Sequence, residues 1–281
     1  MEFEQYDNPG KFYDMLKHLK ITNIIENELM LGLTHLLILD PNHFDIPPFL
    51  ATIKDHNKVI LCAFMTPPWS ILVHGVSSLD NRPFQVLIEH LVEEKIKVPG
   101  VNGESEFSEK FAEIWCYKTK CQKRLHMASR LYVLKEVYLV KYTPGQLKKA
   151  EMDYLDLLIK WTKKFHKEVK LGVKEEYIKN HVKFIIETGN AFIWFDEQPV
   201  CMVFFERPHE DGVSIGYVYT PAEFRNKGYA TSCVSSVSKH ALDSGYSYCS
   251  LFADLANPTS NNIYQRVGYQ PVCDYIYYDF K

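Results

Sequence analysis

The sequence lacks the features that would direct the protein to a membrane, a secretory route or a nucleic acid. No apolar stretch approaches the ~20 residues that a helix needs to cross a bilayer. Residues 1–7 are acidic and have no signal-peptide pattern. The 32 Lys and Arg residues face 35 Asp and Glu residues, so the net charge is −3 and no basic footprint for nucleic acid is evident. We therefore expect a cytoplasmic protein that contacts neither membranes nor nucleic acid.

Patterns for disulfides and metal sites are also missing. The seven cysteines are odd in number, scattered and never spaced as C-x-x-C, which favours reduced thiols over a disulfide framework. The 11 histidines include no H-E-x-x-H motif and no pairing with cysteine at zinc spacing. We expect no metal cofactor. The sequence leaves the oligomeric state open between a monomer and a homodimer.

Enough apolar residues are present for a large core. Hydrophobic residues make up 46% of the 281 residues and aromatic residues 14%, so one large or two medium domains are expected. Periodic patterns in the first half predict an α/β domain over residues 1–141. Its expected helices lie within 11–33 and at 82–94 and 105–118, its strands at 34–39, 59–65, 70–74 and 131–140, and a loop at 98–103.

The second domain is expected over residues 142–281, after a junction at Lys141–Gly145. Its predicted helices are 144–169, 173–187, 231–243 and 258–267, its strands 213–219, 248–253 and 274–280, and its hairpin 191–195 with 200–205. Lys160, Lys163, Lys164 and Lys167 form a basic face on the first helix, which favours a solvated surface over a landing strip for an anionic partner. The fold class is therefore α/β (α+β), a tandem of two mixed-sheet domains.

The most informative stretch is Tyr219–Thr231, which follows an alternating strand pattern. Pro221 ends the strand because it has no N–H to donate. A loop containing Arg225 and Gly228 then leads into a helix. The first N–H groups of a helix are unsatisfied and its dipole is positive there, so this layout suits an anion. The loop is neither a Walker motif nor G-x-G-x-x-G, and by itself it could equally be an ordinary strand–turn–helix connection.

A second motif follows about thirty residues downstream. Asn257 and Pro258 are typical of a helix start, Gly268 of a helix end, and Tyr264 lies between them. The two motifs, R-x-x-G-x-A and N-x-x-S/A-x-x-I/L-Y-x-x-x-G-Y/F, in this order and at this distance, resemble the GNAT superfamily of acyl-CoA N-acyltransferases. The resemblance covers residues 142–281, and the predicted order α-α-β-β-β-α-β-α-β is the one that the GNAT fold requires.

The resemblance implies a central, mostly antiparallel sheet flanked by helices, and an N-acetyltransferase that moves an acetyl group from acetyl-CoA to a primary amine in a ternary complex. Asn257 would bond the pantetheine arm, act only as a helix cap, or do both. Tyr264 would be the general acid that protonates the leaving thiolate, since a phenol is protonated at neutral pH; it could otherwise be a core tyrosine. The residues implied for the pantetheine arm are Val218, Tyr219 and Thr220, and those for the pyrophosphate are Arg225, Asn226, Lys227, Gly228, Tyr229, Ala230 and Thr231.

The general base and the amine acceptor stay open. Some family members have a glutamate where this strand has Ser214, which leaves Glu206, Glu223, an ordered water or no dedicated base. The missing glutamate is also the one argument for a non-catalytic acyl-CoA sensor. Cys233 and Cys249 lie in apolar patterns, which favours direct transfer over a cysteine intermediate. The first half resembles a degenerate GNAT-like copy, expected to be a scaffold or a wall of the acceptor pocket.

Overall fold

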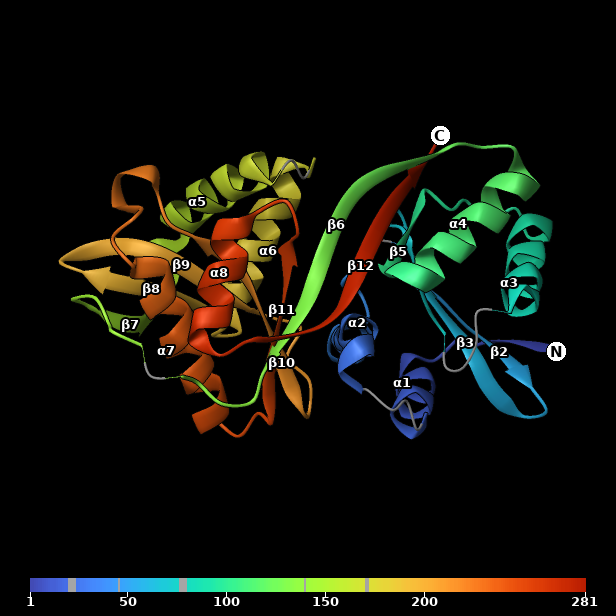
Figure 1. The fold of residues 1–281 in the computed structure, drawn as a ribbon, viewed down its shortest axis with the longest axis horizontal. Helices are drawn as coiled ribbons and strands as arrows, with labels where there is room; N and C mark the ends of the chain where they lie inside the picture. The colour runs from blue at the N-terminus through green and yellow to red at the C-terminus, as the bar shows by residue number, and fades with distance from the viewer. Residues whose placement is uncertain (20–23, 45, 76–79, 139, 170–171) are drawn as a thin grey trace. The chain divides into compact units, whose positions relative to one another are not determined.

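The computed structural model describes residues 1–19, 24–44, 46–75, 80–138, 140–169 and 172–281, which form two compact units. The first unit contains Met1–Leu131, Ala253–Ala256 and Pro271–Lys281, and the second contains Tyr132–Phe252 and Asn257–Gln270. Each unit is built on a mixed sheet covered by helices (Figure 1). In the described ranges, no helix combines the length and the apolar character needed to cross a membrane.

The sheet of the first unit has the strand order β1-β2-β3-β4-β5-β12-β6. Its pairs are antiparallel from β1 to β4 and between β5 and β12, and parallel between β4 and β5. The strands are β1 (Glu2–Gln5), β2 (Phe49–Asp55), β3 (Lys58–Met65), β4 (Ile71–Gly75), β5 (Gly100–Glu104), β6 (Lys123–Leu134) and β12 (Gln270–Phe280); the helices are α1 (Pro9–His18), η1 (Ile24–Asn27), α2 (Glu28–Leu39), α3 (Asn81–Glu93) and α4 (Ser105–Thr119).

Alternation along the strands gives this sheet two apolar faces. Ala51, Ala63 and Val73 point to one face, where they pack with residues of α3 and α4. Leu50 and Phe64 point to the other face, where they pack with residues of α1 and α2. The unit is therefore a three-layer structure in which a helix pair covers each face of the sheet.

The second unit has the strand order β11-β10-β9-β8-β7. Only the β10–β11 pair is parallel among the strand pairs with an assigned register. Helices α5 and α6 pack on one face, around Leu158, Ile178, Met202 and Phe204. The strands are β7 (Gln146–Lys149), β8 (Ala191–Asp196), β9 (Gln198–Glu206), β10 (Gly212–Tyr219) and β11 (Tyr248–Asp254); the helices are η2 (Met152–Tyr154), α5 (Leu155–Glu168), α6 (Glu175–Glu187), η3 (Ala222–Phe224), α7 (Tyr229–Asp243) and α8 (Pro258–Val267).

The two halves of the chain repeat one order of elements: a strand, two helices, three strands, a helix, a strand, a helix and a strand, apart from short 3-10 turns. The parallel pair recurs at the same place in both, as β4–β5 and as β10–β11. This confirms the predicted tandem of two mixed-sheet domains. We propose residues 1–141 and 142–281 as the two repeats, with β12, the last strand of the second, lying beside β5 in the first unit.

Four predicted segments were wrong. Residues 34–39 end helix α2 instead of forming a strand, because a short apolar run does not distinguish a strand from a buried helix. The predicted loop 98–103 contains β5, and the strand predicted at 131–140 is β6, which begins at Lys123 and ends at Leu134. The helix predicted from residue 144 begins at Leu155, because Gln146–Lys149 pair with β8 as an edge strand. Residues 20–23 of the helical prediction 11–33 lie outside the described residues.

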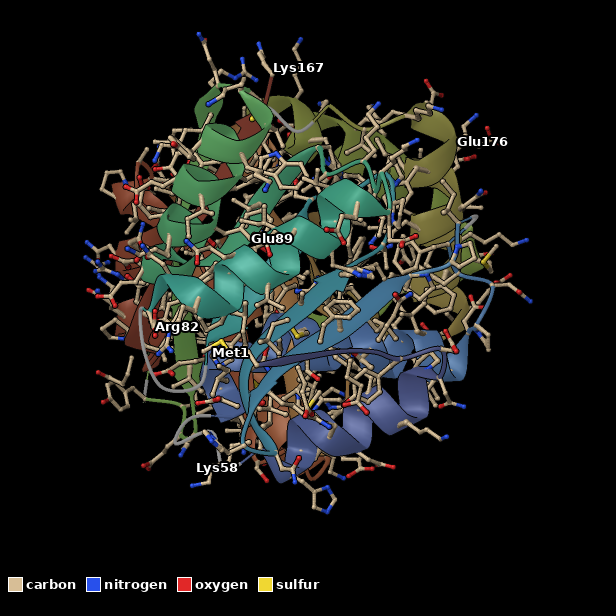
Figure 2. All side chains as sticks on the ribbon, turned by 90° about the vertical axis from the view of Figure 1, so that its right-hand side faces the viewer. Met1, Lys58, Arg82, Glu89, Lys167 and Glu176 are labelled. Carbon is tan, nitrogen blue, oxygen red and sulfur yellow. The ribbon has the colours of Figure 1, made fainter. Side chains whose placement is uncertain are left out.

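The other predicted helices and strands are confirmed within a few residues. The basic face of α5 is solvated, as predicted: Lys160, Lys164 and Lys167 are exposed, and Lys163 donates to Glu175 Oε1 at 2.5 Å. Figure 2 shows Lys167 extending outward from the ribbon.

Candidate active site in the second unit

Strands β10 and β11 part from each other along their length. In the described ladder, the parallel register runs from Gly212↔Tyr248 to Ser214↔Ser250 and then stops. The register of β10 with β9 shifts between Gly216 and Tyr219, and Tyr217 has the left-handed φ of +52°. Such a bulge bends a strand and increases its twist. The second part of β10, which contains Val218 and Tyr219, is therefore separated from the β11 ladder.

Helix α7 starts with an uncapped end close to this opening. Its N-cap is Gly228, with a φ of +87°, and no side chain caps its first turn. Asp80 and Asn257, by contrast, accept a backbone N–H at the starts of α3 and α8. A Cβ on Gly228 would lie 3.1 Å from Thr143 Cγ2, so the position favours glycine for both conformation and space. The N–H groups of the first turn, at Tyr229–Thr231, are left for an anion.

The predicted loop residues do not all point at this helix start. Arg225 donates from Nε to the carbonyl of Thr220 at 2.8 Å and from Nη2 to Glu168 Oε1 at 2.7 Å. Tyr229 donates its hydroxyl to Asp196 Oδ2 at 2.6 Å, which raises the pKa of Tyr229. The Arg225–Glu168 pair was missed in the sequence because these residues lie on different elements.

The other predicted loop residues lie at or near the surface. Asn226 and Lys227 are exposed, and Lys227 Nζ lies 5.7 Å from the ring centre of Phe224. Ala230 and Thr231 are half-buried in the first turn of α7.

Helix α8 carries Tyr264, the predicted general acid, as one of its buried residues. Asn257 Oδ1 accepts from Ser260 N at 3.2 Å, so the predicted helix cap is confirmed. Tyr264 is 9% exposed, and its ring meets that of Tyr269 edge-on, with centroids 6.0 Å apart. Burial raises the pKa of Tyr264 above its ordinary value. Its phenol is therefore protonated at neutral pH and can donate a proton.

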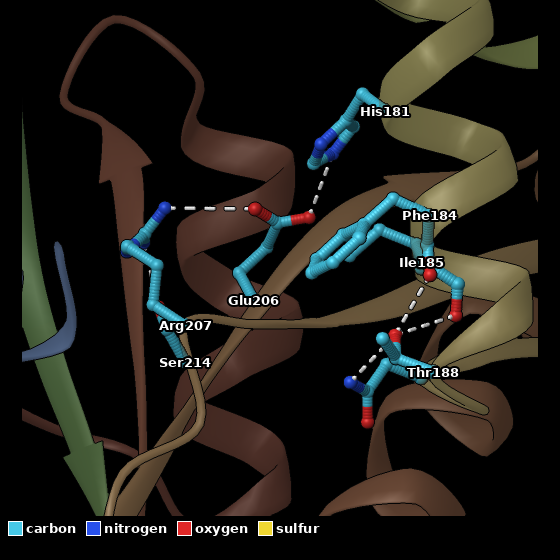
Figure 3. Close-up of polar contacts among 8 residues, drawn as sticks. His181, Phe184, Ile185, Thr188, Glu206, Arg207 and Ser214 are labelled. Atoms are coloured by element: carbon cyan, nitrogen blue, oxygen red, sulfur yellow. Dashed lines mark hydrogen bonds and ion pairs between the residues drawn. The ribbon is translucent and has the colours of Figure 1, made fainter. Parts of the chain in front are cut away.

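A buried carboxylate lies at the end of β9 (Figure 3). Glu206 places Oε1 3.1 Å from His181 Nε2 and Oε2 3.6 Å from Arg207 Nη1. Arg207 also donates from Nη2 to Ser214 Oγ at 3.2 Å. The imidazole of His181, on α6, therefore has a carboxylate as its hydrogen-bond partner. The available signal was alternation: Met202 and Phe204 face α5 and α6, so Glu206 had to face them too.

The two cysteines considered as nucleophiles are poorly suited to that role. Both Cys233 and Cys249 are fully buried. Burial raises the pKa of Cys233 well above its usual range and that of Cys249 to about 12. A thiol nucleophile reacts as its thiolate, which is scarce under these conditions.

The corresponding places in the first unit carry different residues. The connection from β4 to α3 corresponds to the connection from β10 to α7, and its residues 76–79 lie outside the described residues. Asp80 caps α3, and Arg82 Nε donates to Asp80 Oδ2 at 2.8 Å. Phe111 follows Glu104, the α4 cap residue, by the same number of residues in the sequence as Tyr264 follows Asn257.

No group of three or more metal-binding side chains capable of holding a metal occurs in the part of the chain that the structure describes.

No curated protein matches the sequence. Solved structures match over nearly the whole chain. A GNAT-family acetyltransferase from Colwellia psychrerythraea is 9% identical, with a TM-score of 0.65 and coverage of 100% of both chains. A Drosophila protein is 12% identical, with a TM-score of 0.69, covering 99% of this chain and 98% of its own.

A tandem GNAT protein from the clavulanic acid biosynthesis pathway is 11% identical, with a TM-score of 0.56, covering 99% of this chain and 97% of its own. These identities are low, so the three structures show a shared fold. The family model described as an acetyltransferase (GNAT) domain matches residues 139–270. The chain therefore contains a GNAT acetyltransferase domain over residues 139–270.

Proposed function

We propose that the second repeat transfers an acetyl group from acetyl-CoA to a primary amine, by direct attack in a ternary complex. The observation that carries this proposal is the juxtaposition of two features on one connection. Strand β10 leaves β11 after Ser214, and the helix that follows begins at Gly228 without a side-chain cap. The part of β10 that leaves β11 suits the amides of an extended pantetheine arm, and the uncapped start of α7 suits a pyrophosphate.

The residues present fit acetyl-CoA at this place. Thr220 Oγ1 is buried and has no hydrogen-bond partner among the described residues, which is costly unless a ligand or water supplies one. We propose that Val218, Tyr219 and Thr220 hold the pantetheine arm and that Asn257 bonds it with the part of its amide that the helix cap does not use. The pyrophosphate is assigned to Arg225, Asn226, Lys227, Gly228, Tyr229, Ala230 and Thr231.

Tyr264 supplies the proton for the leaving thiolate in this proposal. Its phenol is buried, its pKa is raised by burial, and it therefore stays protonated until the thiolate develops. The buried thiols of Cys233 and Cys249 favour the same direct route. The amine would attack the thioester carbonyl carbon while the carbon–sulfur bond breaks.

The test is a calorimetric titration with acetyl-CoA, followed by an amine-acceptor screen that measures thiol release. We expect one equivalent bound per chain, because Asp80 and Phe111 stand where the first repeat would need an uncapped helix and a phenol. Tyr264→Phe should lower kcat by about 100-fold or more while acetyl-CoA binding stays within about twofold. Tyr246→Phe is the matched control and should be unchanged.

Two equivalents would mean that the first repeat also binds. Equal turnover by the wild type and Tyr264→Phe would remove the general-acid role. Tight binding with no transfer to any amine would favour the acyl-CoA sensor. The missing strand glutamate was the argument for that sensor, and Glu206, opposite Ser214 in the ladder, weakens it.

A further inference from the structure

Glu206 lies in the row where strands β10 and β11 begin to part. Ser214 pairs with Glu206 on β9 and with Ser250 on β11, and Ser214↔Ser250 is the last parallel pair. Residues directly opposite each other in a ladder point to the same face, so these three side chains share the face covered by α5 and α6. A carboxylate therefore stands at the narrow end of the opening assigned above to the thioester arm.

Gly216 makes room for this carboxylate at the bulge. A Cβ on Gly216 would lie 2.7 Å from Glu206 Cγ, so any other residue would collide with the Glu206 side chain. Gly216, Tyr217 and Val218 are only half-buried, whereas Glu206 is 7% exposed. Glu206 is thus more buried than the part of β10 at the bulge.

Polar and aromatic side chains surround Glu206. His181 and Arg207 contact it directly. Tyr217 stacks at an angle on His181, with centroids 5.1 Å apart, and the ring of His166 lies 5.5 Å from that of Tyr217. The titratable and charged groups that face this cluster come from α5, α6, β9 and β10: His166, Tyr177, His181, Glu206, Arg207 and Tyr217.

His166 supplies an independent observation. It is 5% exposed, and neither ring nitrogen has a hydrogen-bond partner among the described residues. Burial first, and then the neighbouring His181, lower the pKa of His166. A buried neutral imidazole with open nitrogens is expensive in a purely structural cluster, because each unsatisfied buried polar group costs stability. That cost is offset where a polar group of a ligand enters and bonds the His166 nitrogens.

A structural ion pair between Glu206 and Arg207 would explain neither histidine. Arg207 Nη1 lies 3.6 Å from Glu206 Oε2, and Arg207 Nη2 donates to Ser214 Oγ. The shorter contact is to the imidazole of His181. An imidazole beside a carboxylate is an arrangement that passes a proton on at neutral pH.

We propose that Glu206 accepts the proton of the acceptor ammonium and that His181 is the residue that positions its carboxylate. The proposal rests on the amine transfer proposed above and names its general base. Among the open alternatives it selects the buried Glu206 over Glu223, which is exposed on η3.

The proton balance is complete with groups on this chain. The ammonium N–H bond breaks and its proton passes to a Glu206 oxygen, which leaves the nitrogen lone pair free. That pair forms the bond to the thioester carbonyl carbon, and the carbon–sulfur bond breaks towards sulfur. Tyr264 gives its proton to the thiolate and regains one from the second N–H of the acceptor nitrogen. Glu206 then releases its proton through His181 to solvent.

The experiment compares the wild type, Glu206→Gln and the matched control Glu223→Gln on the amine that reacts fastest in a panel of lysine, spermidine and 2-phenylethylamine. The kcat/KM for thiol release is measured from about pH 6 to about pH 9.5, with acetyl-CoA affinity measured by calorimetry. Glu206→Gln should lower kcat/KM by about 100-fold near neutral pH. The deficit should shrink as pH rises, because the amine then loses its proton in solution. Acetyl-CoA affinity and the control should stay within about twofold.

His181→Asn should lower kcat more than it raises KM and should shift the pH profile, which mere loss of packing would not do. Unchanged Glu206→Gln profiles would overturn the proposal. So would a deficit that is constant with pH and accompanied by weaker acetyl-CoA binding. If the wild type binds acetyl-CoA but acetylates no amine of the panel, the transferase proposal fails and the base falls with it. If Glu206→Gln alone is normal, the transferase stands and only the base is wrong.

Discussion

The start of helix α7 gives a specific prediction, because substitutions of Gly228 change the backbone there and can add a charge. Gly228 has a φ of +87°, where an L-residue pays about 1–2 kcal/mol. A Cβ there would also meet Thr143 Cγ2 at 3.1 Å. Gly228→Ala should therefore lower the free energy of unfolding by about 1–2 kcal/mol. It should weaken acetyl-CoA binding a few-fold, because the methyl group narrows the approach to the N–H groups.

Gly228→Glu has the same backbone cost and adds a negative charge. Two unit charges about 6 Å apart at an effective dielectric constant of about 20 repel each other by about 3 kcal/mol. The affinity for acetyl-CoA should then fall by about 100-fold or more relative to the wild type. A carboxylate near a helix N-terminus stabilises the helix by about 0.3–1 kcal/mol, so Glu should be at least as stable as Ala at this position. Stability and affinity are thus expected to rank these two variants in opposite orders.

Calorimetric titration with acetyl-CoA and urea unfolding at one fixed ionic strength measure the two quantities. Gly245→Ala is the control, because Gly245 has a φ of +105° just beyond the other end of α7 and a Cβ there would meet no atom within 4 Å. It should lose stability as Gly228→Ala does and keep its affinity. If the Ala and Glu variants at position 228 bind equally well, no anion sits at this helix start. If Gly245→Ala weakens binding as much, the effect is one of helix stability.

Two further predictions concern charges. Glu168→Gln should tighten acetyl-CoA binding a few-fold, because it frees the Arg225 guanidinium and removes a nearby carboxylate; calorimetry tests this against Asp243→Asn, a surface pair partner that should have no effect. His74 is buried, and desolvation lowers its pKa from 6.5 to about 4. Its folded pKa is depressed, so stability is fully present above pH 6.5 and is lost as pH falls towards 4, by up to about 3 kcal/mol. His74→Leu should flatten the stability profile in that window, and an unchanged slope would show that His74 does not titrate on unfolding.

Proline and glycine residues at the ends of helices and strands account for the part of the fold that was predicted well. Pro258 opens α8 and Gly268 ends it, and Pro221 ends β10. The errors arose where local pattern and tertiary context disagree. Residues 34–39 belong to a helix although their short apolar run also suits a strand, and residues 146–149 form a strand only because β8 offers an edge.

The candidate site likewise contains residues that local motifs predict and pairs that only the folded structure brings together. Gly228 and Tyr264 were predicted from motifs, which depend on neighbours in the chain. The Glu206–His181 pair joins β9 to α6, and the Arg225–Glu168 pair joins a loop to α5. Neither pair has a sequence spacing that reveals it. The alternation from Met202 through Phe204 is the one local signal that Glu206 points inward.

The differences between the repeats bear on why the first has been kept. An anion at the start of α3 would meet the carboxylate of Asp80, and Phe111 has no proton to give. Yet the first repeat supplies β5, and Tyr275–Asp279 of β12 pair with it from Glu104 to Gly100. Removing it would expose the main-chain groups of β12 on that side and the buried ring of Tyr275. The first unit therefore pairs the last strand of the second repeat, although Asp80 and Phe111 stand at its own corresponding places.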